Sequence, residues 1–79
     1  MLHFNKPAEF AASPEGQDLM GDILSGRDIM LVVVESLGGE RIFGVVERVE
    51  DGYLYLHNSE DPDDPIGYDI SIISRIEEN

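Results

Sequence analysis

The chain contains no cysteine, and this absence excludes two kinds of structure. Without thiols there is neither a disulfide nor a thiolate metal site, and the composition fits a reducing compartment. A chain of 79 residues allows one domain with a modest core. Association between copies is therefore the most accessible source of additional stability.

Long hydrophobic runs are also missing. The longest uninterrupted apolar run covers residues 29–34, far less than a membrane-spanning helix requires. The N-terminal sequence MLHFNKPAEF lacks the apolar stretch of a signal peptide. We therefore expect a cytoplasmic protein that has no membrane partner.

Basic residues are scarce. Seventeen Asp and Glu residues face five Lys and Arg residues, which gives a formal net charge of −12. Phosphate contacts dominate the affinity of nucleic-acid-binding proteins, so non-specific electrostatic binding to a polyanion is disfavoured. A local nucleic-acid site on an acidic body remains open, and the acidity also maintains solubility.

The residues that are present predict three consecutive antiparallel strands over 29–35, 40–50 and 53–57. Turns are expected at 37–39 and at Asp51-Gly52, the latter a strong hairpin signal. Gly44 lies within the second strand, five residues after the turn residue Gly39. A glycine inside a strand indicates a bend or a close approach, and a bent strand allows a small sheet to close into a barrel.

Other segments complete the predicted domain. Ser13-Pro14-Glu15 is a helix-start signal, and we expect the helix to end near Gly26. Residues 58–65 predict a loop because they combine prolines and acids, and two short strands follow over 66–70 and 72–76, broken near Ser71. We expect a lead segment at 1–12, loose or docked through Phe4 and Phe10. The domain over 13–79 is mainly β, with a helix before a bent five-stranded antiparallel barrel.

This order of elements resembles the Sm/LSm family of small barrels that form rings and bind RNA. The resemblance is carried by Val32, Val34, Gly39, Gly44, Val46, Val49, Glu50 and Leu56. Two segments, YDISIISRI at 68–76 and Gly-Gln-Asp-Leu at 16–19, look most like the bacterial host-factor branch. The resemblance implies a homo-oligomeric ring in which the last two strands join neighbouring subunits, through Ile66, Tyr68, Ile70, Ile72 and Ile73.

The residues with which the family reads RNA are missing. Gly52-Tyr53 and Asp69-Ile70 occupy the two base-reading regions, and Glu35 stands where the host-factor branch stacks a base on tyrosine. The candidates for nucleic-acid binding are therefore few: Tyr53 for stacking, with Gln17, Arg41, Arg48 and Arg75. Alternatively, the arginines pair with neighbouring glutamates and the tyrosines are ordinary strand residues.

The sequence predicts neither a metal site nor an active site. The acids at 60–64 lack the glycine and the spaced glutamate of a calcium loop. His3 and His57 have no cysteine nucleophile and no recognisable Ser-His-acid setting, so we expect a non-enzymatic protein without a cofactor.

Two hypotheses about function remain. In the first, the chain is an Sm-like ring subunit that binds single-stranded RNA or DNA weakly and locally. In the second, it is an acidic oligomeric adaptor, or a nucleic-acid mimic, that binds a basic protein partner.

Overall fold

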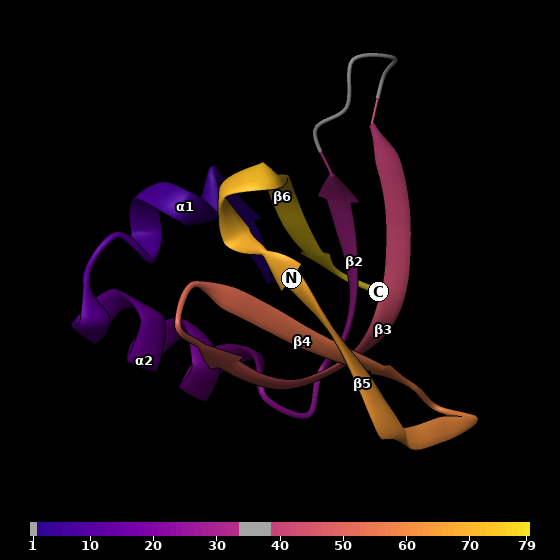
Figure 1. Ribbon diagram of the computed structural model, residues 1–79. Helices are drawn as coiled ribbons and strands as arrows, with labels where there is room; N and C mark the ends of the chain where they lie inside the picture. The colour runs from indigo at the N-terminus through magenta and orange to yellow at the C-terminus, as the bar shows by residue number, and fades with distance from the viewer. Residues whose placement is uncertain (1, 34–38) are drawn as a thin grey trace.

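A computed structural model describes residues 2–33 and 39–79 (Figure 1). It contains one antiparallel sheet of six strands in the spatial order β1-β6-β2-β3-β4-β5. Two α-helices precede the main strands, and a 3₁₀ turn separates the last two. The bounds are β1 His3–Asn5, α1 Pro7–Phe10, α2 Pro14–Leu24, β2 Asp28–Val33, β3 Glu40–Glu50, β4 Tyr53–Asn58, β5 Asp61–Asp69, η1 Ile70–Ile72 and β6 Ile73–Glu78.

Helix α2 confirms the predicted start and end signals. The Ser13 side chain caps the helix by accepting a hydrogen bond of 3.1 Å from the Gly16 N–H, and Pro14 occupies the first turn. The chain leaves the helix at Ser25, and Gly26 adopts a φ of 81°, a left-handed conformation that glycine tolerates.

Strand β3 confirms the predicted long strand. Its first half, from Glu40 to Val45, pairs with β2, and its second half pairs with β4. Gly44 lies where the strand changes partner: a Cβ atom there would be 3.1 Å from the His57 carbonyl oxygen. The predicted hairpin turn is confirmed, because Asp51 and Gly52 both adopt positive φ angles, 51° and 82°. The predicted turn at 37–38 and the strand end at 34–35 lie outside the described residues.

The sheet has six strands, whereas the sequence predicted five. The additional strand β1 comes from the segment expected to be loose or docked, and it pairs with β6 through His3↔Glu77, Phe4↔Ile76 and Asn5↔Arg75. The sheet order leaves β1 and β5 as edge strands that do not pair with each other within the described ranges. The six-stranded sheet is therefore open, and a closed barrel is not confirmed.

The prediction of a loop over 58–65 is wrong for Asn58, the last residue of β4, and for residues 61–65, which belong to β5. The pairing shifts between Leu56↔Ile66 and Asn58↔Asp61, so β5 bulges where its prolines lie. Because β5 is an edge strand, a proline there removes no hydrogen bond from the interior of the sheet. Prolines and acids therefore do not exclude a strand at this position. The predicted break near Ser71 is confirmed as η1.

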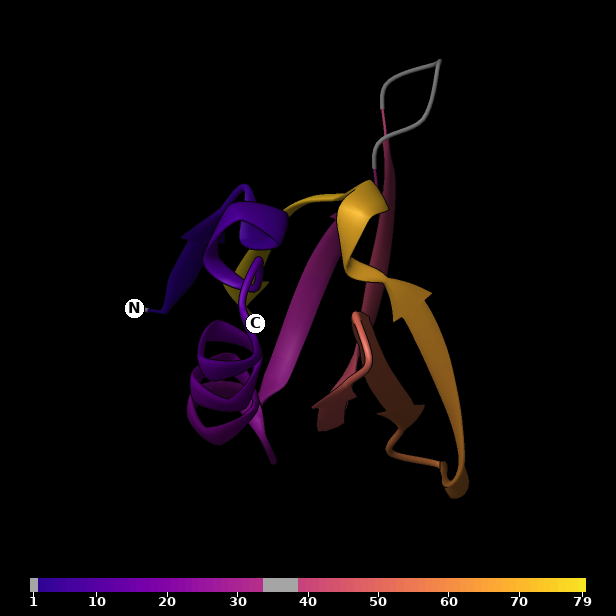
Figure 2. The ribbon, with the colours of Figure 1, turned by 60° about the vertical axis from the view of Figure 1, so that its left-hand side comes forward.

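The two faces of the sheet differ. The face that we call the inner face carries Ile29, Leu31 and Val33 of β2, which are buried. Helix α2 contributes Met20 and Leu24 to the same core cluster, and Figure 2 shows both helices beside β2, away from β5. The opposite face, the outer face, has no helix over it in this view. Within the described residues, no helix is long and apolar enough to span a membrane.

Candidate functional site

The predicted nucleic-acid residue Arg48 is occupied by contacts within the chain. Its guanidinium group lies 2.9 Å from a carboxylate oxygen of Glu47 and 3.3 Å from one of Glu50. The same group lies 4.0 Å from the centre of the Tyr55 ring, in cation–π geometry. For Arg48, the interpretation that arginines pair with neighbouring glutamates therefore holds.

Arg41 and Arg75 lie elsewhere. Both are directly opposite Val32, Arg41 on β3 and Arg75 on β6, so they flank that residue on the outer face. Arg75 lies 3.4 Å from a carboxylate oxygen of Glu77. For Arg41, no ion pair is formed with any residue of 2–33 or 39–79. The three candidate arginines are thus divided between two parts of the sheet.

Gln17 and Tyr53 lie near the turn between β3 and β4. The Gln17 side-chain oxygen accepts a hydrogen bond of 3.0 Å from the Gly52 N–H, so this residue ties α2 to the hairpin. Tyr53 is 43% exposed, and the centre of its ring lies 6.5 Å from that of the Tyr55 ring. Of these two candidates Tyr53 is the more exposed, whereas Gln17 is half-buried and already uses its side-chain oxygen within the chain.

Some of the predicted oligomer-interface residues are exposed, and others are buried. Ile66 and Ile72 are 56% and 44% exposed, whereas Ile70 and Ile73 are buried in the chain's own core and Tyr68 packs partly against it. Strand β6 already has a neighbour on each side, β2 and β1. A ring contact through the backbone of 73–76 would therefore have to displace β1.

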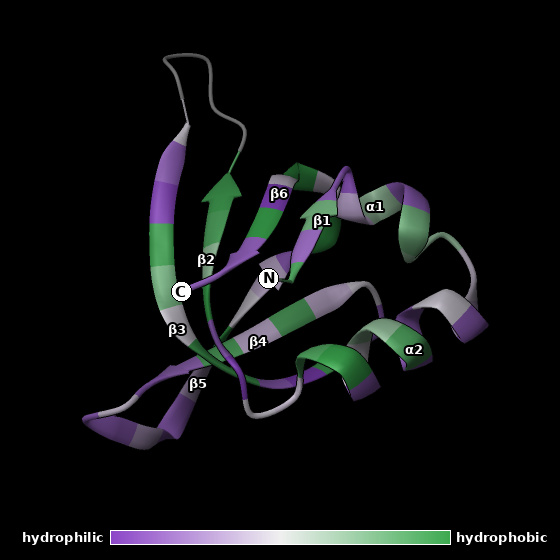
Figure 3. Ribbon diagram, turned by 180° about the vertical axis from the view of Figure 1, so that it is seen from behind, coloured by the Kyte–Doolittle hydropathy of each residue, from purple (hydrophilic) through white to green (hydrophobic). Residues whose placement is uncertain are grey.

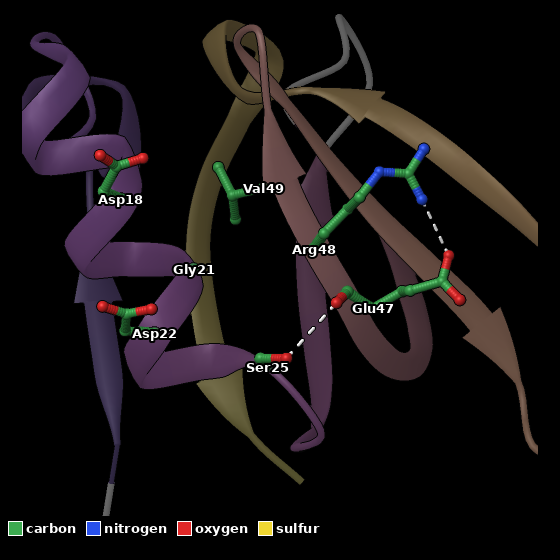
Figure 4. A pocket seen from close by; sticks show the side chains of 7 residues that line it. All are labelled: Asp18, Gly21, Asp22, Ser25, Glu47, Arg48 and Val49. Carbon is green, nitrogen blue, oxygen red and sulfur yellow. Dashed lines mark hydrogen bonds and ion pairs between the residues drawn. The ribbon is translucent and has the colours of Figure 1, made fainter.

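The structure adds a groove that the sequence did not predict. It lies between α2 and β3 and has a volume of about 470 Å³. Figure 4 shows Asp18 and Asp22 on the helix side and Val49 between the helix and the strand, whereas the side chains of Glu47 and Arg48 extend from the strand away from the helix. At one end the Ser25 hydroxyl donates a hydrogen bond of 3.4 Å to the Glu47 carbonyl oxygen.

A second hollow of about 360 Å³ continues this groove past Asp18 and Val49. It adds Glu50 and Asp51 to the walls, and it reaches Gln17 at the start of the helix. The two hollows together form what we call the acidic groove. Its one cation, Arg48, is already paired with two of its carboxylates. The negative charge that faces the groove therefore comes mainly from Asp18 and Asp22 of α2, beside the apolar side chain of Val49.

Two features of the sequence could have indicated this groove. Asp18 and Asp22 are spaced by four residues, so they share one face of a helix. Gly21 lies between them, and its missing side chain lets the helix approach β3, where an added Cβ would lie 3.6 Å from the Val49 Cβ. The contact between helix and strand is tertiary, however, and no local pattern in the chain specifies it.

Two carboxylates outside the groove, Asp69 and Glu78, have pKa values below their ordinary values. Hydrogen bonds from the Ser71 hydroxyl and the Ser71 N–H lower the pKa of Asp69. A hydrogen bond from the Leu2 N–H, together with the Arg27 guanidinium at 2.7 Å, lowers the pKa of Glu78. Both groups therefore hold local structure, at η1 and where the two termini meet.

Within the described parts of the chain, no group of three or more His, Cys, Asp or Glu side chains could hold a metal ion. Comparison with protein-family models, curated proteins and solved structures finds no match.

Proposed function

We propose that the chain is a non-enzymatic binding module whose acidic groove takes a basic segment of a protein partner. The observation that supports this function most directly is the charge of the groove. Asp18 and Asp22 of α2 line it, and Arg48, the cation of the neighbouring strand, is already paired with Glu47 and Glu50. Opposite charge steers association and disfavours wrong partners.

The chemistry of the groove limits the kind of ligand. Asp18 and Asp22 are one helical turn apart, a spacing that suits two cationic side chains of one segment. Val49 and the backbone at Gly21 offer apolar contact to the methylene stems of lysine or arginine. A segment with two or more Lys or Arg residues therefore fits better than a single small cation.

A fluorescent peptide of alternating lysine and glycine residues is a suitable probe. With Asp18→Asn and Asp22→Asn together, we expect the affinity to fall by roughly tenfold, because two charged contacts are lost. The matched control replaces Asp63 and Asp64 on β5 with asparagine, which changes the net charge equally. Anisotropy titrations compare the proteins. Equal losses in both double variants would indicate attraction by net charge and would refute a role for the groove.

Single-stranded RNA binding by an Sm-like ring subunit is the second candidate function. One observation favours it: Tyr53 exposes its ring beside Tyr55, over which Arg48 lies. Such a surface can stack a base. The order of α2 and the strands β2–β6, with β3 bent near Gly44, also suits the proposed family.

Two features weigh against this second candidate. Arg48 is paired with two glutamates, and β1 occupies the edge of β6 that a ring contact would need. Native mass spectrometry with a mixed-sequence single-stranded RNA separates the candidates. RNA uptake that Tyr53→Ala abolishes would support the Sm-like function. Uptake of the basic peptide alone would support the adaptor.

A further inference from the structure

The outer face of β2 and β3 carries an apolar surface over which no helix of the described chain lies. Met30 lies directly opposite Phe43, and Val32 and Val45 extend the surface along the two strands. Phe43 is 57% exposed, although phenylalanine is a residue that folding usually removes from water. The apolar residues of β2 lie on both faces of the strand, and within the described residues the helices cover only the inner one.

The charges around this surface have a definite order. In the row of Val32, Arg41 and Arg75 lie on either side of the apolar residue. Two residues earlier on β2, Met30 lies opposite Phe43 of β3 on one side and Glu77 of β6 on the other. Two residues further, Asp28 is exposed beside Val45. The surface thus has a basic end, an apolar middle and an acidic end.

This order is complementary to itself. Consider a two-fold axis that lies between two facing sheets and crosses the strands at the row of Met30 and Phe43. The axis reverses the strand direction, so the basic end of one copy faces the acidic end of the other. Asp28 of one copy then lies opposite Val32 of the second copy, between the two arginines that flank it. Phe43 faces its own counterpart, at the spacing of about 10 Å that packed sheets adopt.

We propose that two copies of this chain associate face to face through the outer faces of β2 and β3. The balance of charge agrees with a second copy as the occupant. On the outer face of β2, the paired half of β3 and β6, Arg41 and Arg75 offset Asp28 and Glu77, so these strands contribute no net charge, although the whole chain carries −12. Asp61 and Asp64 of β5 border the surface, in a hollow that Phe43 also lines. A strongly basic partner suits the acidic groove better than this balanced surface. The surface is small, so the dimer dissociates on dilution.

The acidic groove is a separate surface. It lies between α2 and β3 near Val49, in the half of β3 that pairs with β4, whereas the dimer surface uses the half that pairs with β2. Loss of the dimer therefore leaves peptide binding in place, and the two proposals fail independently.

Analytical ultracentrifugation of the full chain over a range of concentrations tests the dimer. We expect Phe43→Ser to weaken the association by roughly tenfold or more, because Phe43 contacts its counterpart at the centre of the interface. Leu19→Ser is the matched control, since Leu19 is also exposed but lies on α2. A wild-type protein that stays monomeric at every concentration would overturn the proposal. So would a dimer that Phe43→Ser and Leu19→Ser leave equally stable.

A charge-exchange experiment tests the arrangement of the two copies. Asp28→Arg places an arginine against two arginines, and Arg41→Asp places an aspartate against an aspartate, so each variant alone is expected to remain monomeric. When the two variants are mixed, each exchanged residue meets an opposite charge, and native mass spectrometry is expected to detect the heterodimer. A mixture that stays monomeric while the wild type dimerises would refute this geometry.

Discussion

The two faces of the same strand, β2, have different environments. Ile29, Leu31 and Val33 point into the core, where α2 and β6 contribute further apolar side chains. Met30 and Val32 point the other way and remain partly exposed. Figure 3 shows that β2 itself is largely hydrophobic, while hydrophilic residues concentrate at the turn between β4 and β5. Hydrophobicity on both faces therefore reflects two different roles: one face stabilises the chain, and the other is available to a second copy.

Substitution of neighbouring residues on β2 tests this difference most strongly. Leu31→Ala leaves a cavity in a fully buried position, and we expect the free energy of unfolding to fall by about 2–5 kcal/mol. Val32→Ala removes a partly exposed side chain, so we expect a loss below about 1 kcal/mol. Urea unfolding at a concentration where the protein is monomeric measures both. Equal losses would contradict the assignment of the two faces.

The bend of β3 is the next largest expected effect. A Cβ at Gly44 would lie 3.1 Å from the His57 carbonyl oxygen and 3.2 Å from the Leu56 Cβ, so a larger side chain has to push β4 away. We expect Gly44→Val to reduce the free energy of unfolding by about 1–3 kcal/mol. Gly44→Ala is the graded control, with a smaller loss. Thermal unfolding provides the measurement, and an unchanged midpoint in both variants would show that β3 and β4 do not approach as described.

In helix α2, which packs over the inner face, we predict a substitution that increases the free energy of unfolding. Gly21→Ala adds a Cβ at 3.6 Å from that of Val49, an ordinary contact, and alanine is the better helix former. We expect a gain of roughly 0.5–1 kcal/mol. Gly16→Ala is the contrasting variant, because its Cβ would overlap the Phe10 carbonyl oxygen and the protein should lose stability. Urea unfolding of both variants decides, and a gain from Gly16→Ala would contradict the described contact with α1.

Local signals explain which parts of the fold could be predicted. Ser13-Pro14 and Asp51-Gly52 specify their conformations through their own backbones and side chains, so the helix start and the hairpin turn were predicted correctly. Gly44 likewise indicated the place where β3 closely approaches β4 and changes from one neighbouring strand to the other. Strand β1 carries no such signal, because its pairing with residues 75–77 joins segments at opposite ends of the chain. Strand β5 was missed over 61–65 because an edge strand tolerates prolines.

The candidate sites could be predicted only in part. Residue types identified Arg41, Arg48, Arg75 and Tyr53 as possible contacts, but not which of them would meet. Arg48 and Tyr55 come together only through the pairing of β3 with β4. The acidic groove depends in the same way on the approach of α2 to Val49. For the outer face, the continuous apolar run places apolar side chains on both sides of the strand, but only the sheet register reveals the order of charges along it.

The smallest expected effect concerns β6, where Glu77 lies on the outer face and Glu78 faces the opposite way. Hydrogen bonding from the Leu2 N–H and pairing with Arg27 lower the pKa of Glu78 below its ordinary value of 4.5, so its ionised form stabilises the folded state. This contribution is complete above the ordinary pKa and disappears as the pH falls through the lowered one. We therefore expect Glu78→Gln to unfold more readily than the wild type at pH 7.

The difference in unfolding midpoint between Glu78→Gln and the wild type should shrink on acidification and vanish below the lowered pKa. Glu60→Gln, in the exposed turn between β4 and β5, is the charge-matched control. Both variants remove one negative charge, so any general relief of repulsion among the acids appears in both and cancels in the comparison. A deficit of Glu78→Gln that persists at low pH would mean that the charge of Glu78 does not hold the termini together. Chemical denaturation across the acidic range decides between these outcomes.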